Sequence, residues 1–288
     1  MSDPLFSIKN NFFLGAYNAV INEASSLHNV SPNDAIDRDC YLYRSYIALG
    51  SHDLVIQEVS DSASTALLSI KLLAQYLSGK KNKAEVISTL QEWLSDLACN
   101  RNPTVLFVAG SIYVHENMFP EALRCCHKGF TLEMSALCVQ VYIKMDRVDK
   151  AEQQLKAMAT QDDDATLTQL ATAWVGVALG GSKIQEASYI YQELGDKYTW
   201  TPLLLNGRAI CAMKRGEWED AERDLLEALG KDAKDSDTLA NLSACGLHLG
   251  RNVQRYQSQL KMLQPNHPYI KHLEVGEELF QRVVASVS

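Results

Sequence analysis

The amino-acid sequence predicts an all-α protein, an α-solenoid of about eight helix pairs followed by a C-terminal capping helix. Three observations support this prediction. Turn-forming residues recur every 29 to 38 residues. Alanine recurs at a fixed distance after most of these turns. Alternating polar and apolar runs, which are typical of strands, are nearly absent. The solenoid is expected over residues 1–265 and the capping helix, packed on the last repeat, over residues 266–288.

The turn positions define the repeat. They are small or polar residues of the kinds that tolerate a tight turn between helices, namely Gly15, Gly50, Gly79, Asn117, Asp146, Ser182, Gly216 and Gly250. Their mean spacing is about 34 residues, the length of a tetratricopeptide repeat. The pattern therefore predicts tetratricopeptide-like helix pairs, in which we number the turn residue as position 15.

Two further rows of residues fit this repeat. Position 20 is expected where the two helices of a pair approach closely, and it holds alanine in five successive repeats, Ala84, Ala122, Ala151, Ala187 and Ala221. Position 17 is expected to open the second helix with a bulky apolar side chain, as Tyr17, Phe119, Val148, Ile184 and Trp218. Together the rows have the three- and four-residue spacing of amphipathic helices.

The end of the chain departs from the regular pattern. Arg255 occupies position 20 of the last repeat, where a charge is not expected to be buried. A shift of one residue instead gives an apolar stripe of Tyr256, Leu260 and Leu263. After two prolines, which favour a break and a restart, residues 269–287 read as one more helix that covers the end of the stack.

A candidate binding surface follows from the repeat. The first helices of such arrays line the concave face, and position 12 is apolar in all eight repeats, as Phe12, Ile47, Tyr76, Val114, Ile143, Leu179, Met213 and Leu247. An exposed ribbon of this length is expected to be covered by a partner segment. The alternative is that these side chains are partly buried against the neighbouring repeat.

Composition excludes several other functions. The net charge of −8 and the isoelectric point near 5.4 argue against nucleic acids and against direct attraction to anionic lipid. The seven cysteines are odd in number and form no CxxC motif, which indicates reduced, buried thiols and a cytosolic protein. No signal peptide is expected, and the apolar stretches are too short to span a membrane. Any membrane association is therefore expected to be indirect, through partners.

Catalytic and metal-binding motifs are not found. The sequence has no GxGxxG, P-loop, GxSxG or HExxH motif, so we expect no catalytic residue, cofactor, metal or small-molecule substrate. Residues Cys125–His127 leave an enzyme open as an alternative, although Cys126 falls on a core position. The acidic run Asp162–Asp164 is interpreted as a solvated turn rather than a cation site.

Position 13 argues against a co-chaperone. Co-chaperones of the tetratricopeptide type hold a carboxylate with Lys, Asn and Arg at fixed groove positions. No repeat assembles that set, because position 13 holds Phe13, Ala48, Leu77, His115, Lys144, Gly180, Lys214 and His248.

The order of several motifs resembles the epsilon-subunit family of coatomer, the coat complex of COPI vesicles. The motifs are Phe12–Asn18, Ile21–Glu23, Arg44–Gly50, His115–Asn117, Glu121–Arg124, Leu205–Gly207, Glu219–Glu222, Leu239–Leu242 and His267–Lys271. The resemblance implies a non-catalytic structural subunit of the heptameric coatomer that binds and stabilises the C-terminal domain of the alpha subunit. It also implies a cytoplasmic protein, peripheral on Golgi membranes and COPI vesicles, in retrograde Golgi-to-ER and intra-Golgi transport.

The resemblance and the ribbon together give one mechanistic hypothesis. An element of the alpha subunit is expected to cover the position-12 ribbon, first at Ile143, Leu179, Met213 and Leu247, where the repeat is most regular. Another cytosolic tetratricopeptide-type adaptor, a co-chaperone or a tether component, remains the alternative.

Overall fold

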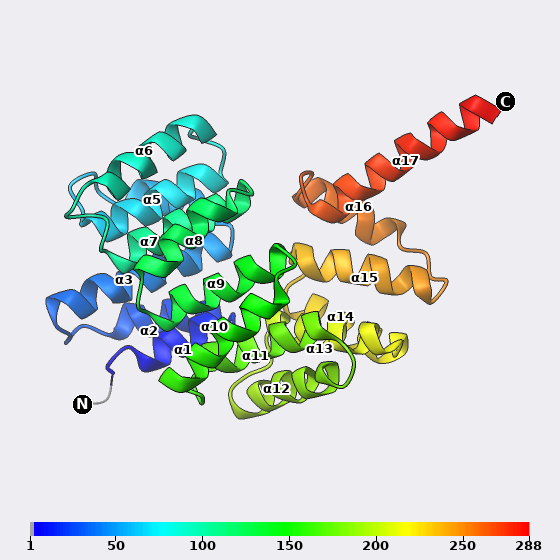
Figure 1. Ribbon diagram of the computed structural model, residues 1–288, viewed down its shortest axis with the longest axis horizontal. Coiled ribbons are helices and arrows are strands. Elements are labelled where there is room, and N and C mark those ends of the chain that lie inside the picture. The colour runs from blue at the N-terminus through cyan, green and yellow to red at the C-terminus, as the bar shows by residue number, and fades with distance from the viewer. Residues whose placement is uncertain (1–2, 288) are drawn as a thin grey trace. The chain divides into compact units, whose positions relative to one another are not determined.

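The computed structural model describes residues 3–287, which form seventeen helices and no strand (Figure 1). This confirms the predicted fold class, because the helices follow one another as eight pairs and one further C-terminal helix. The chain divides into two compact units, with the division after Leu179. The predicted boundary at residue 265 stays a prediction.

Unit 1 ends at Leu179 and contains eleven helices among its described residues. They are α1 (Phe6–Phe13), α2 (Tyr17–Ser26), α3 (Pro32–Ala48), α4 (His52–Glu58), α5 (Thr65–Leu77), α6 (Lys83–Ser95), α7 (Pro103–His115), α8 (Phe119–Lys128), α9 (Leu132–Lys144), α10 (Val148–Gln161) and α11 (Thr166–Leu179).

Unit 2 begins at Gly180 and contains six helices in the described part of the chain. They are α12 (Lys183–Lys197), α13 (Pro202–Arg215), α14 (Trp218–Lys231), α15 (Ser236–His248), α16 (Gln254–Leu263) and α17 (Pro268–Val287).

Short polar side chains before a proline begin several first helices. The Ser31 hydroxyl accepts a hydrogen bond of 3.2 Å from the backbone N–H of Asp34, and the Asn102 side chain accepts one of 3.0 Å from the N–H of Thr104. The following proline suits the first helical position because that N–H has no partner within the helix. Ser31 and Asn102 are therefore the N-terminal caps of α3 and α7.

Seven of the eight predicted turn residues adopt the left-handed backbone that ends each first helix. They have φ between 56° and 81° and are Gly15, Gly50, Gly79, Asn117, Asp146, Gly216 and Gly250. The exception is Ser182, which has φ −62° and precedes α12. Gly180 and Gly181, with φ 81° and 57°, make this turn instead, because glycine enters the left-handed region without a steric cost.

The alanine row is confirmed in four repeats and wrong in one. Ala122, Ala151, Ala187 and Ala221 are buried, whereas Ala84 is exposed. The second helix of that pair, α6, starts at Lys83, two residues later in the repeat than α8 or α14. This delay moves the buried positions of α6 by two residues, to Val86 and Leu90.

The first helix of unit 1 packs against the last helix of this unit, which is distant from it in the sequence. α1 contacts α11, and the Thr166 hydroxyl donates a hydrogen bond to the buried side-chain oxygen of Asn10. Phe13 packs against the apolar cluster that α9, α10 and α11 share. Figure 1 shows α1 close to α11 within this unit. The first and last helices of unit 1 are therefore in contact, although more than 150 residues separate Asn10 from Thr166.

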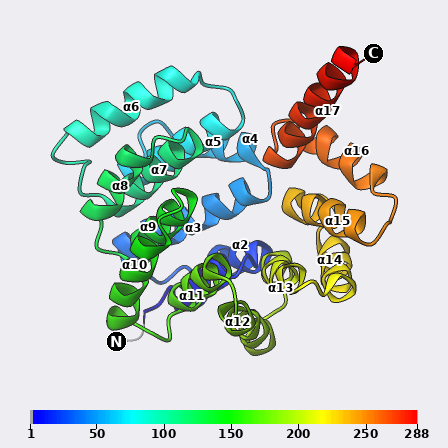
Figure 2. The same ribbon diagram turned by 45° about the vertical axis from the view of Figure 1, so that its right-hand side comes forward.

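The last pair follows the predicted one-residue shift only in part. Leu260 is buried and Tyr256 packs beside it, but Leu263 is exposed. The C-terminal helix α17 packs through its first turn, where Ile270 is buried against the same cluster. Beyond it, the described side chains are exposed, and in Figures 1 and 2 α17 extends past α16. Capping of the stack by the whole helix stays a prediction.

Candidate protein-binding surface

The predicted ribbon is mostly not exposed in unit 1. Ile47 and Val114 are only 8% exposed and belong to the main apolar core of the unit. Phe12, Tyr76 and Ile143 are half-buried and pack against apolar clusters. Of the six position-12 residues in this unit, Leu179 is the exposed one, with 43% of its surface accessible to solvent.

Unit 2 also contains one half-buried and one exposed position-12 residue. Met213 is half-buried against the cluster formed by α13, α14 and α15, whereas Leu247 is 54% exposed at the end of α15. The expectation of an uninterrupted exposed ribbon is therefore wrong. Six of the eight position-12 side chains pack against apolar clusters instead, as the alternative interpretation allowed. Binding of a partner at these residues stays a proposal, and Leu179 and Leu247 are the two most accessible.

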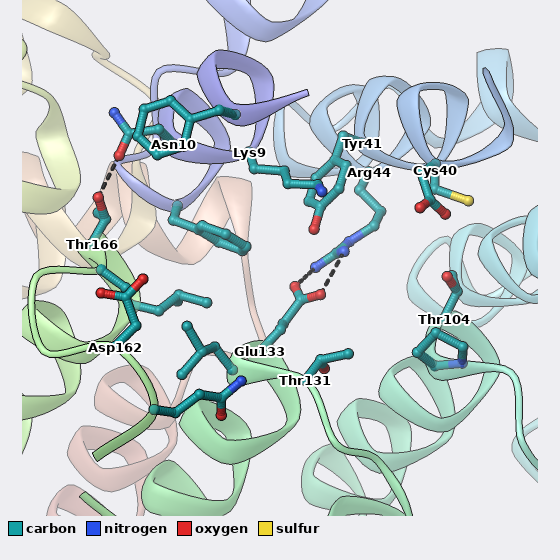
Figure 3. A pocket seen from close by; sticks show the side chains of 18 residues that line it. Lys9, Asn10, Cys40, Tyr41, Arg44, Thr104, Thr131, Glu133, Asp162 and Thr166 are labelled. Carbon is teal, nitrogen blue, oxygen red and sulfur yellow. Dashed lines mark hydrogen bonds and ion pairs between the residues drawn. The ribbon is translucent and has the colours of Figure 1, made fainter. Parts of the chain in front are cut away.

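Sequence reasoning missed a pocket of about 400 Å³ in unit 1 (Figure 3). Helices α1, α3, α7, α9, α10 and α11 line it. Its lining includes Asp37, Thr104 and Glu133, which all occupy position 2 of their repeats. Position 2 faces the groove in tetratricopeptide arrays, so polar residues in this row were the available signal.

A buried ion pair lies in the lining of this pocket. Arg44 of α3 is 8% exposed and donates two hydrogen bonds to the Glu133 carboxylate of α9, one of them 3.2 Å long (Figure 3). Its guanidinium lies 4.5 Å from the ring centre of Phe12 and 4.3 Å from that of Phe107. Burial alone lowers the pKa of Arg44, but the charge and hydrogen bonds of Glu133 outweigh it and the pKa is raised. Arg44 therefore stays charged and joins α1, α3, α7 and α9.

The cysteine cluster has the environment of a core rather than of a reactive thiol. Cys125 and Cys126 are buried, and burial raises the pKa of Cys125 to about 11. The hydrogen bond with Cys138, together with burial, raises the pKa of Cys126. The His127 ring lies 3.3 Å from the hydroxyl of Tyr142. A raised pKa leaves little thiolate, the form in which a cysteine acts as a nucleophile.

Labelling with a thiol reagent at neutral pH is expected to separate the cysteines by burial. Cys99 is the one that is not buried among the seven, all of which lie in the described part of the chain. It should react first, whereas Cys125 and Cys126 should react only after denaturant is added. Mass spectrometry of labelled peptides locates the modified residue. Rapid labelling of Cys125 in the folded protein would instead favour the enzyme alternative.

Residues 3–287 contain neither a cluster of metal ligands nor a helix that could span a membrane. No three His, Cys, Asp or Glu side chains in this range gather as a metal-binding group. Within the same range, no helix combines the length and the apolar character that crossing a membrane requires.

Comparison with known proteins decides the family. The family model described as Coatomer epsilon subunit matches residues 1–288. The chain belongs to the coatomer epsilon subunit family. This family is part of the COPI coat, and its members serve vesicle transport as structural, non-catalytic subunits.

Relatives from distant organisms agree with this assignment. Coatomer subunit epsilon-2 of Arabidopsis thaliana is 50% identical over 286 residues, covering 99% of this chain and 97% of the relative. Coatomer subunit epsilon of Dictyostelium discoideum is 35% identical and covers 97% of each chain. The protein of the same name from Caenorhabditis elegans is 33% identical over 99% of each chain.

Solved structures of other proteins resemble this chain in fold only. A tetratricopeptide repeat protein from Parabacteroides merdae superposes with a TM-score of 0.61 at 17% identity, covering 89% of this chain and 96% of that one. A chain of the APC/C hetero-tetramer Cut9-Hcn1 gives a TM-score of 0.60 at 12% identity, covering 93% of this chain and 53% of that one. The helix pairs are therefore of the tetratricopeptide type, as their spacing predicts.

Proposed function

We propose that this chain is a non-enzymatic structural subunit of the COPI coat that binds and stabilises the C-terminal domain of the coatomer alpha subunit. The observation that carries the proposal is the family match, which extends over all 288 residues. Through the assembled coatomer, the chain acts on Golgi membranes from the cytosol, in retrograde Golgi-to-ER and intra-Golgi transport.

The exposed ends of first helices support a role in binding. Leu179 ends α11 and Leu247 lies one residue before the end of α15, and both expose much of their side chains. Burying such side chains against a partner gives about 25 cal/mol per Å² of apolar surface, before the costs of association. The half-buried members of the ribbon, such as Met213, contribute mainly to the fold of their own unit.

The test substitutes Leu179→Asp and Leu247→Asp together. A charge placed in an apolar contact is desolvated without a partner, so affinity for the purified alpha C-terminal domain should fall roughly tenfold or more. The change should appear in isothermal titration calorimetry, while far-UV circular dichroism should stay that of the unchanged protein. Met213→Asp is unsuitable because Met213 packs in the core of unit 2.

A matched double variant controls for surface charge. Leu97 in unit 1 and Leu226 in unit 2 are also exposed leucines, but they lie outside the first helices. Leu97→Asp with Leu226→Asp should bind the alpha domain as the unchanged protein does. Equal binding by both double variants and the unchanged protein would contradict the assignment of the position-12 residues as the contact.

A further inference from the structure

Exposed apolar side chains are concentrated at the C-terminal end of unit 2. Within residues 3–287, eight of the twenty large apolar side chains that are exposed lie between Met262 and Val284, and the other twelve are spread over the rest of this range. Six of the eight belong to α17, whose described side chains beyond Ile270 are all exposed. A patch of this kind on a soluble protein marks a surface that a partner covers.

Most of these side chains share one face of α17. The spacing alternates between three and four residues, which gives a single apolar stripe along the helix. The residues of this α17 stripe are Leu273, Gly276, Phe280 and Val283. Glu278 and Arg282 lie on the opposite face, where they pair with each other at 3.6 Å. The helix is therefore amphipathic, and its apolar face is exposed along most of its length.

Gly276 is an independent indication that something approaches this stripe closely. A glycine inside a helix lowers the stability of the helix relative to alanine. A Cβ atom on Gly276 would meet nothing within 4 Å, so the glycine is not required by any contact inside the single chain. A second helix laid on the stripe would use the missing side chain, because it could approach the α17 backbone at this point.

The stripe is complementary to a second copy of itself in the antiparallel direction. In that arrangement Phe280 of each helix lies level with Gly276 of the other, and Leu273 lies level with Val283. A large ring then fills the space beside a glycine in two symmetric layers. A parallel pair would instead set Phe280 against Phe280 and Gly276 against Gly276, and it would also align the two helix dipoles unfavourably.

The exposed area agrees with a weak dimer. A fully exposed side chain of this size carries on the order of 100 Å² of apolar surface. Seven of the eight, leaving out Val275 beside the stripe, are between 40% and 82% exposed. Two copies that cover these side chains would bury about 800 Å² of apolar surface, which corresponds to about 1,200 Å² in total at the usual apolar share of a homodimer interface. That is the lower limit for stable interfaces.

We propose that two copies of this chain pair through the α17 stripe, with the helices antiparallel and with Phe280 of each copy packed against Gly276 of the other. The contact covers the apolar face of α17 in both copies. The inference concerns the chain alone, so it holds or fails independently of the proposed binding to the alpha subunit.

The first experiment is sedimentation equilibrium of the full chain from about 1 µM to about 300 µM. The mass should rise from the 32.1 kDa of one chain towards twice that value, with a dissociation constant on the order of 10–100 µM. Phe280→Gln with Val283→Gln should weaken association at least tenfold, while far-UV circular dichroism stays unchanged. The control Val275→Gln removes an exposed valine of the same helix outside the stripe and should associate as the unchanged protein does.

A second pair of variants tests the direction of the helices. Gly276→Leu fits the single chain but would collide with Phe280 of the other copy, so it should abolish the dimer, and adding Phe280→Ala should restore it. In a parallel dimer Gly276→Leu would strengthen association instead, which would contradict the antiparallel arrangement. A chain that stays monomeric at every concentration would overturn the proposal, and so would a dimer that Phe280→Gln with Val283→Gln leaves intact. If the monomeric chain also loses affinity for the alpha domain in this variant, the alpha domain covers the stripe instead.

Discussion

Replacing Arg44 with leucine is expected to lower the free energy of unfolding of unit 1 by about 3 kcal/mol. The substitution leaves the Glu133 carboxylate of α9 largely buried without its cation, and breaking a buried pair from one side costs about 3–5 kcal/mol. The lower end applies because Glu133 keeps some contact with solvent. Hydrogen exchange followed by mass spectrometry should show faster exchange in α3 and α9 than in α13 and α14 of unit 2.

Two variants distinguish this pair from a surface pair. Arg223→Leu breaks the exposed pair between Arg223 and Asp220, and it should change stability by less than about 1 kcal/mol. The double variant Arg44→Leu with Glu133→Leu removes both charges and should regain most of the lost stability. If Arg44→Leu alone behaves like Arg223→Leu, the ion pair does not join the helices of unit 1.

Replacing Gly207 with alanine is expected to destabilise unit 2 by about 2 kcal/mol. A Cβ atom on Gly207 in α13 would lie 2.4 Å from the ring of Tyr191 in α12, and that ring is buried. Overpacking of this kind costs about 1–3 kcal/mol. The higher helix propensity of alanine offsets only part of the cost, because it contributes about 1 kcal/mol. Urea denaturation followed by circular dichroism measures the change.

Gly230 is the matched control for this substitution. It lies in α14 of the same unit, and a Cβ atom there would meet nothing within 4 Å. Gly230→Ala should therefore leave unit 2 unchanged or stabilise it by up to about 1 kcal/mol. Destabilisation of equal size at both positions would mean that the close contact between α12 and α13 is not the cause.

The repeat was readable from sequence because its signals are local. A left-handed turn residue, a bulky residue at position 17 and a small one at position 20 act within a single helix pair, so their spacing predicted most of the helices. The errors arose where a pair departs from the common length. Gly180 and Gly181 took the turn expected at Ser182, and the late start of α6 moved Ala84 to the surface.

The features that depend on distant segments were not readable. Arg44 and Glu133 are 89 residues apart, and Asn10 and Thr166 are 156 apart. A periodic pattern in the sequence does not indicate that residues so far apart are in contact. The burial of position 12 was left open as an alternative for a similar reason, since Ile47 and Val114 pack in the main apolar core of unit 1 to a degree that the pattern alone does not give.

The central proposal is that this chain is a binding subunit for the alpha C-terminal domain. The most direct measurement is size-exclusion chromatography with light scattering of the purified chain mixed with that domain. A single peak with the mass of a one-to-one complex, stable on dilution, is the expected result. Two separate peaks at every concentration would contradict the claim and leave only the family and the fold.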